Sequence, residues 1–326
     1  MTCIILNSKL MDKIIFYIWY RAPKFLLVLL LPLSGLYFLA ITIRKYLLVN
    51  VFPRYKSQSN VLVIGNLNIG GSGKTPFTIW LANYFKNKKK KVAIVSSGYK
   101  SKVTEPKKID NNSTAEMVGD ESILLYEKTS LTVISSNNRV MSTKYLNDSK
   151  YDYIIHDDGL QHYSLDRQYE FILKKVGSDY KNMYLLPSGP LREPMSFHPN
   201  AQYILSNYRE NDAPGFFCQL ENIRSSKSNK LYELNDKKFL NSTVVTAIAD
   251  SISLIKELET YNVTLKYITF PDHHQFKETD IPIVNEPILV TEKDFVKIKY
   301  FNMDNIYILE QKLLPNDKLL KLIQGL

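Results

Sequence analysis

The longest hydrophobic run lies close to the start of the chain. Phe25–Ile43 (FLLVLLLPLSGLYFLAITI) contains no charged residue, and its length is close to the roughly 20 residues that a helix needs to cross the apolar core of a bilayer. Two basic residues precede the run and two follow it, and Trp19 and Tyr20 stand where interfacial aromatic side chains occur. The pattern predicts an N-terminal membrane-associated helix.

Four arrangements of this helix can be compared. A cleaved signal peptide is disfavoured, because the apolar run is long and no small-x-small cleavage site follows it. A spanning helix and a helix lying in the interface both fit, although Pro32 and Gly35 would kink a spanning helix. A buried helix of a soluble core is the remaining alternative. Either membrane arrangement leaves the body of the protein on one side of the membrane.

Short apolar runs alternate with helical stretches after this segment. Five runs are typical of buried strands: residues 61–67, 92–97, 131–136, 151–158 and 169–176. A helix is predicted at about 74–88, and strands separated by helices predict an α/β fold with a mostly parallel sheet. Residues 185–199 are rich in Pro, Gly and Ser and predict a loop. Further strand-like runs predict a second, smaller α/β domain; they are residues 202–206, 243–249, 266–270, 287–291 and 306–309.

The composition narrows the class of partner. The chain has 326 residues, 45% of them hydrophobic, and a formal net charge of +10. This is globular composition, and the basic excess fits an anionic partner such as a membrane surface or a phosphorylated substrate. The sequence has no arginine-rich arm, zinc-ligand spacing or aromatic RNA-binding signature, so we expect no nucleic-acid partner. Cys3 and Cys218 fit no metal or redox spacing, which is typical of a reduced, cytosolic environment.

A glycine-rich turn joins the first predicted strand to the first helix. Its sequence, GNLNIGGSGKTP at residues 65–76, is typical of a phosphate-binding P-loop, although Asn68 stands where the strict pattern has glycine. The glycines let backbone N–H groups point at phosphates, and the helix N-terminus favours negative charge. Lys74 can reach the β- and γ-phosphates, and the Thr75 hydroxyl can bind Mg²⁺. The candidate nucleotide-binding residues are Gly70, Gly71, Ser72, Gly73, Lys74 and Thr75.

The fourth predicted strand ends in two aspartates, within the sequence YIIHDDGLQH at residues 153–162. In P-loop proteins an acid at the end of a neighbouring strand holds Mg²⁺. Because adjacent strand residues point to opposite faces, Asp157 and Asp158 should do different jobs, and we favour Asp157 for the metal. The alternative is an aspartate that caps the following loop. Candidates for contact with the phosphorylated substrate are Asp158, Gln161, His162, Arg192 and Glu193.

Two further pairs of residues carry candidate acid–base chemistry. Asp120 and Glu121 precede an apolar helical stretch; they either place acids over the C-terminal edge of the sheet or only stabilise a helix N-terminus. His273 and His274 follow a strand-like run, and they either serve acid–base chemistry or form a surface pair. For Arg192 and the glutamate that follows it, a salt bridge within the loop is the alternative.

Taken in order, these motifs resemble the tetraacyldisaccharide 4'-kinase family, the lipid A 4'-kinases of Gram-negative bacteria. The resemblance covers nearly the whole chain; its motifs are GNLNIGGSGKTP (65–76), VGDE (118–121), DDGLQH (157–162), SGPLREP (188–194), PDHH (271–274) and LVTEKDFVKI (289–298). It implies transfer of the γ-phosphate of ATP, with Mg²⁺, to the 4'-hydroxyl of a tetraacyldisaccharide 1-phosphate, giving lipid IVA. It also implies a location on the cytoplasmic face of the inner membrane.

The resemblance implies an architecture as well. The family fold has a P-loop core and a smaller C-terminal α/β domain, bridged by a short β-ribbon. We therefore expect a membrane-anchoring segment at residues 1–50, a P-loop NTPase-like kinase domain at 51–198 and a smaller α/β domain at 199–326. The chain is expected to act as a monomer.

The resemblance also assigns roles to residues. Asp120 would pair with His273 or His274 to activate the hydroxyl, and which histidine acts stays open. Glu121 and Asp157 would join the P-loop threonine as metal candidates.

One position departs from the family pattern. Ser97 stands where the family has an arginine after the second strand. An arginine there would help to neutralise phosphate charge, so we expect Lys100 or Lys102 to replace it.

A different class of function remains open from the residues alone. A membrane-associated P-loop ATPase or GTPase switch would use the same phosphate loop, without needing the histidine pair or the second domain. The two classes differ in whether nucleotide turnover depends on an added lipid acceptor.

Overall fold

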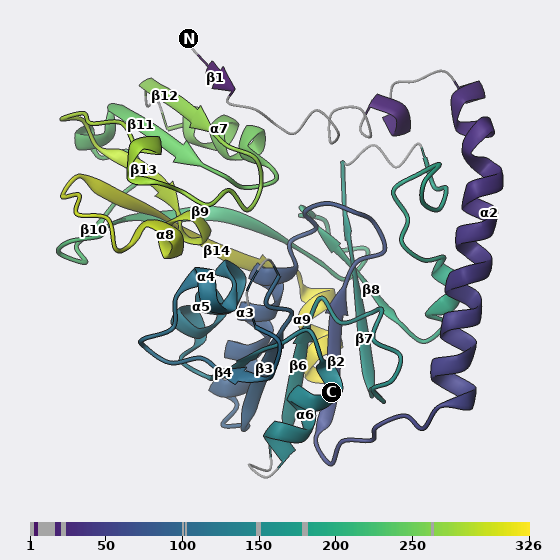
Figure 1. Cartoon of the computed structure of the whole chain (residues 1–326). Helices are drawn as coiled ribbons and strands as arrows, with labels where there is room; N and C mark the ends of the chain where they lie inside the picture. Colours follow the sequence, from purple (N-terminus) through teal and green to yellow (C-terminus); the bar gives the residue numbers. More distant parts are fainter. Residues whose placement is uncertain are drawn as a thin grey trace.

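The computed structural model describes residues 3–5, 17–20, 24–99, 101, 103–147, 151–177, 182–261 and 264–326. Their strands join into one continuous, 14-stranded sheet. Figure 1 shows that the sheet has two halves, connected by the long strands β9 (Gly215–Ser225) and β14 (Ile306–Pro315). The predicted α/β class with a mostly parallel sheet is confirmed.

The first half of the sheet contains the five strands predicted between residues 61 and 176, together with the run 202–206, which was predicted for the second domain but pairs with β7 here. They are β2 (Asn60–Gly65), β3 (Val92–Ser96), β5 (Thr132–Ser135), β6 (Tyr153–Asp157), β7 (Tyr169–Lys175) and β8 (Gln202–Ser206). These strands are parallel and lie in the order β8-β7-β2-β6-β3-β5, with the short antiparallel β4 (Lys107–Lys108) at the edge. The central position of β2 places the glycine-rich turn in the middle of the sheet's carboxyl edge, where α/β folds bind ligands.

Helices cover both faces of this half. They are α3 (Lys74–Asn87), α4 (Ala115–Val118), α5 (Asp120–Thr129) and α6 (Arg139–Asn147). On one face, Phe77 and Leu81 of α3 share the largest apolar cluster with Leu62 of β2. On the other face, Leu146 of α6 packs with Ile154 and other strand residues. The alternation of strand side chains thus supplies two apolar layers, as expected for a sheet buried on both faces.

The second half is smaller and mixed. Its parallel strands are β11 (Asn241–Thr246), β12 (Thr264–Thr269) and β13 (Ile288–Thr291), with β1 (Cys3–Ile5) beside β12 and β10 (Leu231–Tyr232) beside β9. Its helices are α7 (Ser251–Glu259) and α8 (Glu292–Ile298). Short 3-10 turns occur at η2 (Met195–Phe197), η3 (Lys237–Phe239) and η4 (Glu278–Asp280). The sequence pattern predicts neither β1 nor β9.

A two-stranded ribbon joins the halves. β9 and β14 pair antiparallel along their lengths, with an irregularity in register between Glu310 and Gln311, and β9 begins beside β8. After the ribbon the chain returns to the first half as α9 (Asp317–Gln324), where Leu319 and Ile323 join the large apolar cluster. The division of the chain at residues 198 and 199 stays a prediction.

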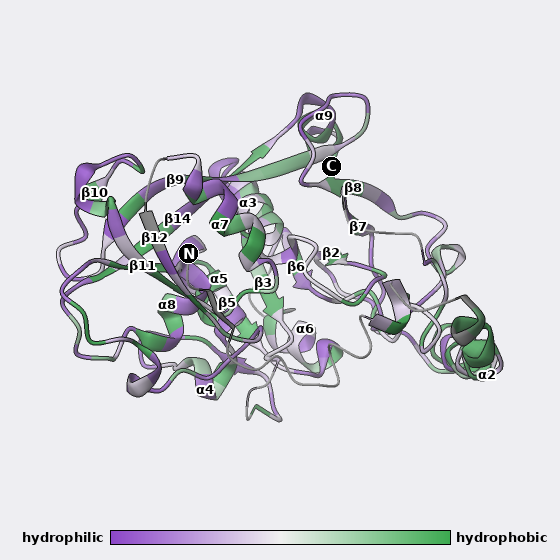
Figure 2. Ribbon diagram, turned by 90° about the horizontal axis from the view of Figure 1, so that it is seen from above, coloured by the Kyte–Doolittle hydropathy of each residue, from purple (hydrophilic) through white to green (hydrophobic). Residues whose placement is uncertain are grey.

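The N-terminal apolar helix is present as α2 (Lys24–Tyr46), followed by the π-helical turn η1 (Leu47–Val51). Figure 1 shows it standing at the side of the first half, away from the second, and Figure 2 shows its hydrophobic colouring. Within Leu27–Val51 the most apolar window has a mean hydropathy of 2.0, and only 6% of that window is buried. A helix of a soluble core would be mostly buried, so that alternative for this segment is wrong.

Candidate active site

The glycine-rich turn lies between β2 and α3 and has the backbone of a phosphate-binding loop. Gly70 and Gly73 have φ values of 126° and 80°, which side-chain-bearing residues rarely adopt. Gly73 is also the N-cap of α3 and offers no side-chain cap, so the first N–H groups of the helix are available to a ligand. The buried Ser72 hydroxyl has no hydrogen-bond partner among the described residues. These features fit a bound polyphosphate.

Lys74 points across the turn. Its Nζ donates to Asn66 Oδ1 at 3.1 Å and lies 3.7 Å from Asp158 Oδ1. Asn66 Nδ2 in turn donates to the carbonyl of Gly70 at 3.2 Å. The lysine is therefore held over the loop by weak, exchangeable contacts, from which a phosphate can draw it away.

The two aspartates at the end of β6 have different partners. Asp157 is buried and accepts a hydrogen bond from Thr78 Oγ1 at 3.0 Å. Burial, together with the neighbouring Glu121 and Asp158 carboxylates, raises the pKa of Asp157 to about 7. Asp158 faces Lys74 and Arg192, whose NH1 lies 3.5 Å from Asp158 Oδ2. Burial by itself would raise the pKa of Asp158, but these two cations outweigh burial and lower it.

This crowding of acids fits a divalent cation. Glu121 lies close enough to Asp157 to raise its pKa, and Thr75 begins α3 nearby in the loop. In the part of the chain that the structure describes, no three His, Cys, Asp or Glu side chains converge to enclose an ion alone. Mg²⁺ typically takes one or two carboxylates and completes its shell with phosphate and water oxygens. The donor set of Thr75, Glu121 and Asp157 therefore suits Mg²⁺ bound together with a nucleotide.

The structure pairs Asp120 with His273 rather than with His274. His273 Nδ1 lies 3.0 Å from Asp120 Oδ2 and 3.2 Å from Asp120 Oδ1. Burial opposes ionisation of Asp120, but the hydrogen bond from His273 and the charge of Lys293 lower its pKa to about 2. His274 turns away: its Nε2 lies 2.9 Å from Asp280 Oδ2. The pair joins the first turn of α5 in the first half to the loop after β12 in the second.

Sequence reasoning missed Lys293. From the start of α8, its Nζ lies 3.3 Å from Glu121 Oε1, from Asp272 Oδ1 and from His273 Nε2. Burial by itself would lower the pKa of Lys293. The neighbouring carboxylates, chiefly those of Glu121 and Asp272, outweigh burial and raise this pKa. The only sequence signal is its place in the motif LVTEKDFVKI, which by itself assigns no role.

Arg139 was also not predicted as a site residue. It is fully buried at the start of α6, and its guanidinium donates to the carbonyls of Val95, Asp157 and Asp158. Burial lowers its pKa to about 10. It therefore fixes the carboxyl ends of β3 and β6, the strands on which the site is built. The expected substitutes for the arginine missing at Ser97, Lys100 and Lys102, lie outside the described residues, so that role stays a prediction.

The remaining substrate candidates lie beside α2. Arg44 of α2 donates to the carbonyl of Gln161 at 3.2 Å. Burial, with Arg139 and Arg44 close by, lowers the pKa of His162 to about 4. Glu193 is buried and accepts from Tyr163 Oη at 2.7 Å, with His198 Nε2 at 3.0 Å. Since Arg192 faces Asp158 instead, the alternative of a salt bridge between Arg192 and Glu193 is not what the structure contains.

One side of α2 is attached to the Pro- and Gly-rich segment. Ser34 Oγ donates to the carbonyl of Leu185 at 3.0 Å, and Tyr37 Oη donates to that of Arg192 at 2.8 Å. Near its end, Lys45 donates to the carbonyl of Phe197. The opposite side exposes large apolar side chains at helical spacing; they are Phe25, Leu29, Leu33, Leu36, Leu39 and Ile43.

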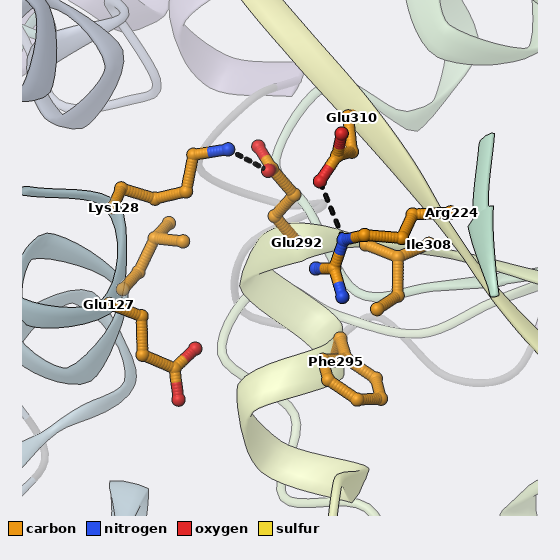
Figure 3. A pocket seen from close by; sticks show the side chains of 8 residues that line it. Glu127, Lys128, Arg224, Glu292, Phe295, Ile308 and Glu310 are labelled. Atoms are coloured by element: carbon orange, nitrogen blue, oxygen red, sulfur yellow. Dashed lines mark hydrogen bonds and ion pairs between the residues drawn. The ribbon is translucent and has the colours of Figure 1, made fainter. Parts of the chain in front are cut away.

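Two cavities differ in their charge. One, of about 280 Å³, lies between α5 and α8, and Figure 3 shows two ion pairs in its lining, Lys128 with Glu292 and Arg224 with Glu310. The other, of about 320 Å³, lies beside the end of α2. Its lining is Arg44, Leu48, Thr104, Asn137, Asn138, Arg139, Val140, His162, Tyr163 and Ser164. None of these is a carboxylate, so the second cavity suits an anion.

Comparisons with known proteins point to one family. The family model described as tetraacyldisaccharide-1-P 4'-kinase matches residues 26–326. A tetraacyldisaccharide 4'-kinase of Wigglesworthia glossinidia brevipalpis is 35% identical over 304 residues, covering 89% of this chain and 81% of the relative. One of Pseudoalteromonas translucida is 31% identical over 313 residues, covering 94% and 95%. The crystal structure of LpxK from Aquifex aeolicus in complex with ATP is similar with a TM-score of 0.77 and 28% identity, covering 92% of this chain and 98% of that one.

Proposed function

Because this chain belongs to the tetraacyldisaccharide-1-P 4'-kinase family, we propose that its site transfers the γ-phosphate of ATP to the 4'-hydroxyl of a tetraacyldisaccharide 1-phosphate, giving lipid IVA. The observation that carries the proposal is the contact between Asp120 and His273, 3.0 Å apart and contributed by different halves of the sheet. Glu121 follows Asp120 in the chain. Its carboxylate forms an ion pair with Lys293, and its negative charge raises the pKa of Asp157. A base is thus assembled beside a phosphate loop.

The chain's own residues account for the transfer. The N–H groups of the loop and Lys74 bind and orient the phosphates and offset charge that grows during transfer. His273 Nε2 accepts the proton of the attacking hydroxyl, while Asp120 holds the Nδ1–H and stabilises the imidazolium that forms. Glycine-rich backbone and buried strand ends keep these groups fixed, which is what phosphoryl transfer needs most.

Thr75, Glu121 and Asp157 are the proposed Mg²⁺ ligands. The ion supplies positive charge that neutralises the phosphate oxygens and lets the buried Asp157 ionise.

The acceptor lipid is proposed to lie against α2. Arg44, Arg139 and His162 line the anion-compatible cavity, and they are suited to the phosphorylated sugar end. Gln161 contacts Arg44 at this cavity and Arg192 contacts Asp158 beside Lys74, so both are proposed to contact the acceptor. The acyl chains would remain among membrane lipids beside the exposed apolar side of α2.

We propose that α2 holds the enzyme at the cytoplasmic face of the inner membrane. The exposed apolar stripe, with Leu29 and Leu36 at 68% and 65% exposure, favours contact with lipid, and ATP is supplied from the cytoplasm. A monomer suffices, because one chain contributes both Asp120 and His273. We also propose that the chain divides into an anchoring segment (1–50), a P-loop domain (51–198) and a smaller domain (199–326).

Transfer of labelled γ-phosphate to a tetraacyldisaccharide 1-phosphate in detergent tests the function, with Asp120→Ala beside wild type. We expect labelled lipid from wild type and almost none from the variant. ATP hydrolysis that does not depend on the lipid, with no labelled lipid, would favour the switch ATPase instead.

A further inference from the structure

Lys293 occupies a position that local helix chemistry disfavours. It is the second residue of α8, where the positive end of the helix dipole repels a cation. Its side chain is only 19% exposed, so solvent does little to offset this repulsion. Residues that break a local rule are expected where function requires them. The compensation here comes from acids outside α8, because Glu121 and Asp272 both lie 3.3 Å from the ammonium.

The third contact of Lys293 bears on the catalytic histidine. A lysine ammonium has hydrogen atoms to donate and no lone pair to accept with. With Lys293 Nζ at 3.3 Å, His273 Nε2 therefore serves as the acceptor. The ring hydrogen then lies on Nδ1, from which it is donated to Asp120 at 3.0 Å. The two contacts together select one tautomer of His273, the one that carries its hydrogen on Nδ1 and its lone pair on Nε2.

A competing arrangement is close at hand. Asp272 Oδ2 lies 3.6 Å from His273 Nε2, so an Nε2–H could be donated to it. Such a ring would have no lone pair available on Nε2. Lys293 opposes this arrangement twice, by donating to Nε2 itself and by binding Asp272 Oδ1.

We propose that Lys293 is a positioning residue for phosphoryl transfer, which keeps the Nε2 of His273 unprotonated until the sugar hydroxyl replaces the ammonium as the donor to that nitrogen. The inference rests on the proposed role of His273 as the base. Lys293 also ties that histidine to the first half through Glu121, so the base and the phosphate loop keep their mutual placement.

Lys293→Met, Lys293→Arg and a control, Lys299→Met, test the proposal. Lys299 is the C-cap residue of the same helix and pairs with Glu127 of α5 at 2.8 Å, so it reports the loss of an ion pair at the same junction away from His273. In the lipid phosphorylation assay we expect Lys293→Met to lower kcat about 100-fold, the lower range for a misplaced general base. The KM for the lipid should change less than about threefold, since Lys293 contacts none of the groups proposed to bind the lipid. Lys293→Arg should recover at least about tenfold, because a guanidinium also donates, and Lys299→Met should retain activity.

A spectroscopic readout separates positioning from folding. The chain has only five histidines, so ¹⁵N-histidine labelling with His273→Gln for assignment can identify the ring. We expect an unprotonated Nε2 in wild type and in Lys293→Arg, and its loss in Lys293→Met. Even if the Met variant does not fold, the Arg variant and the wild-type resonance decide the question.

Three results would overturn the inference. They are a protonated Nε2 in wild type, a kcat for Lys293→Met within threefold of wild type, and equal losses in Lys293→Met and Lys299→Met with no recovery by arginine. If wild type itself makes no labelled lipid, the proposed function fails together with the inference. An active wild type with an active Lys293→Met fails the inference alone.

Discussion

The neighbouring residues His273 and His274 offer a matched pair of substitutions. His273 contacts Asp120 across the two halves of the sheet, at 3.0 Å. His274 instead contacts Asp280 at 2.9 Å and stacks on Phe270, with ring centroids 4.4 Å apart. One ring is therefore built into the site and the other into its own loop. We expect His273→Ala to abolish phosphoryl transfer and His274→Ala to weaken only the loop.

The magnitudes follow from those contacts. A positioned general base contributes roughly 100- to 10,000-fold, so His273→Ala should lower kcat at least about 100-fold. His274→Ala loses one hydrogen bond, about 1 kcal/mol, and two ring contacts, with Phe270 and Phe276, about 0.5 kcal/mol each. Its expected cost is therefore about 2 kcal/mol of unfolding free energy, with kcat within about fivefold of wild type.

The assay is labelled phosphate transfer to the detergent-dispersed lipid, with thermal unfolding of each variant measured alongside. His273→Ala should also melt below wild type, because it removes the hydrogen bond to the buried Asp120 and the ring contact with Tyr99, so each variant is assayed below its own melting temperature. The reasoning would be refuted if His274→Ala lost as much kcat as His273→Ala while remaining folded. It would also be refuted if His273→Ala retained a tenth or more of wild-type kcat.

Three further substitutions test other parts of the site. Burial beside two carboxylates raises the pKa of Asp157 from 3.8 to about 7, so its contribution to stability is complete below pH 3.8 and is lost as the pH rises through 7. Asp157→Asn should therefore raise the melting temperature at pH 8 in Mg²⁺-free buffer, not at pH 3.5, and abolish transfer; an unchanged melting temperature at pH 8 contradicts the pKa assignment. Gly73→Ala places a Cβ at a φ of 80° and 3.2 Å from the Phe216 ring, so ATP affinity should fall at least about tenfold in a fluorescent-nucleotide titration. Leu29→Ser with Leu36→Ser should reduce vesicle binding in flotation and leave activity on detergent-dispersed lipid within about threefold.

The local pattern was sufficient for the strands and for the phosphate loop. Runs such as residues 61–67 and 92–97 are buried on both faces of the sheet. A continuous apolar run of that length is typical of a buried strand. The loop was predictable because strand, glycines and helix are adjacent in sequence. β9 was not predictable, because its burial alternates irregularly where it leaves one half and enters the other. β1 is three residues long and owes its existence to pairing with β12.

The catalytic pair could be narrowed but not completed from the sequence. Asp120 and His273 are 153 positions apart, so their contact at 3.0 Å is a product of the tertiary structure. His274 is the same residue type at the neighbouring position. The structure distinguishes the two histidines by the φ of 59° at His273 and by the contact of His274 with Asp280. Lys293 carries only a weak local signal, its place in the motif LVTEKDFVKI, because its contacts are with acids that two other segments supply.

The placement of this pair at a polar junction has a physical consequence. Three ion pairs join α5 to α8: Glu121 with Lys293, Glu127 with Lys299 and Lys128 with Glu292. Ion pairs that solvent can reach contribute about 1 kcal/mol or less each, whereas the β9–β14 ladder is continuous hydrogen-bonded backbone. The junction also contains apolar contact, because Val296 of α8 shares an apolar cluster with Leu124 and Leu125 of α5. A base assembled from both halves exists only while Asp120 and His273 are in contact, so the groups that join α5 to α8 also support proton removal.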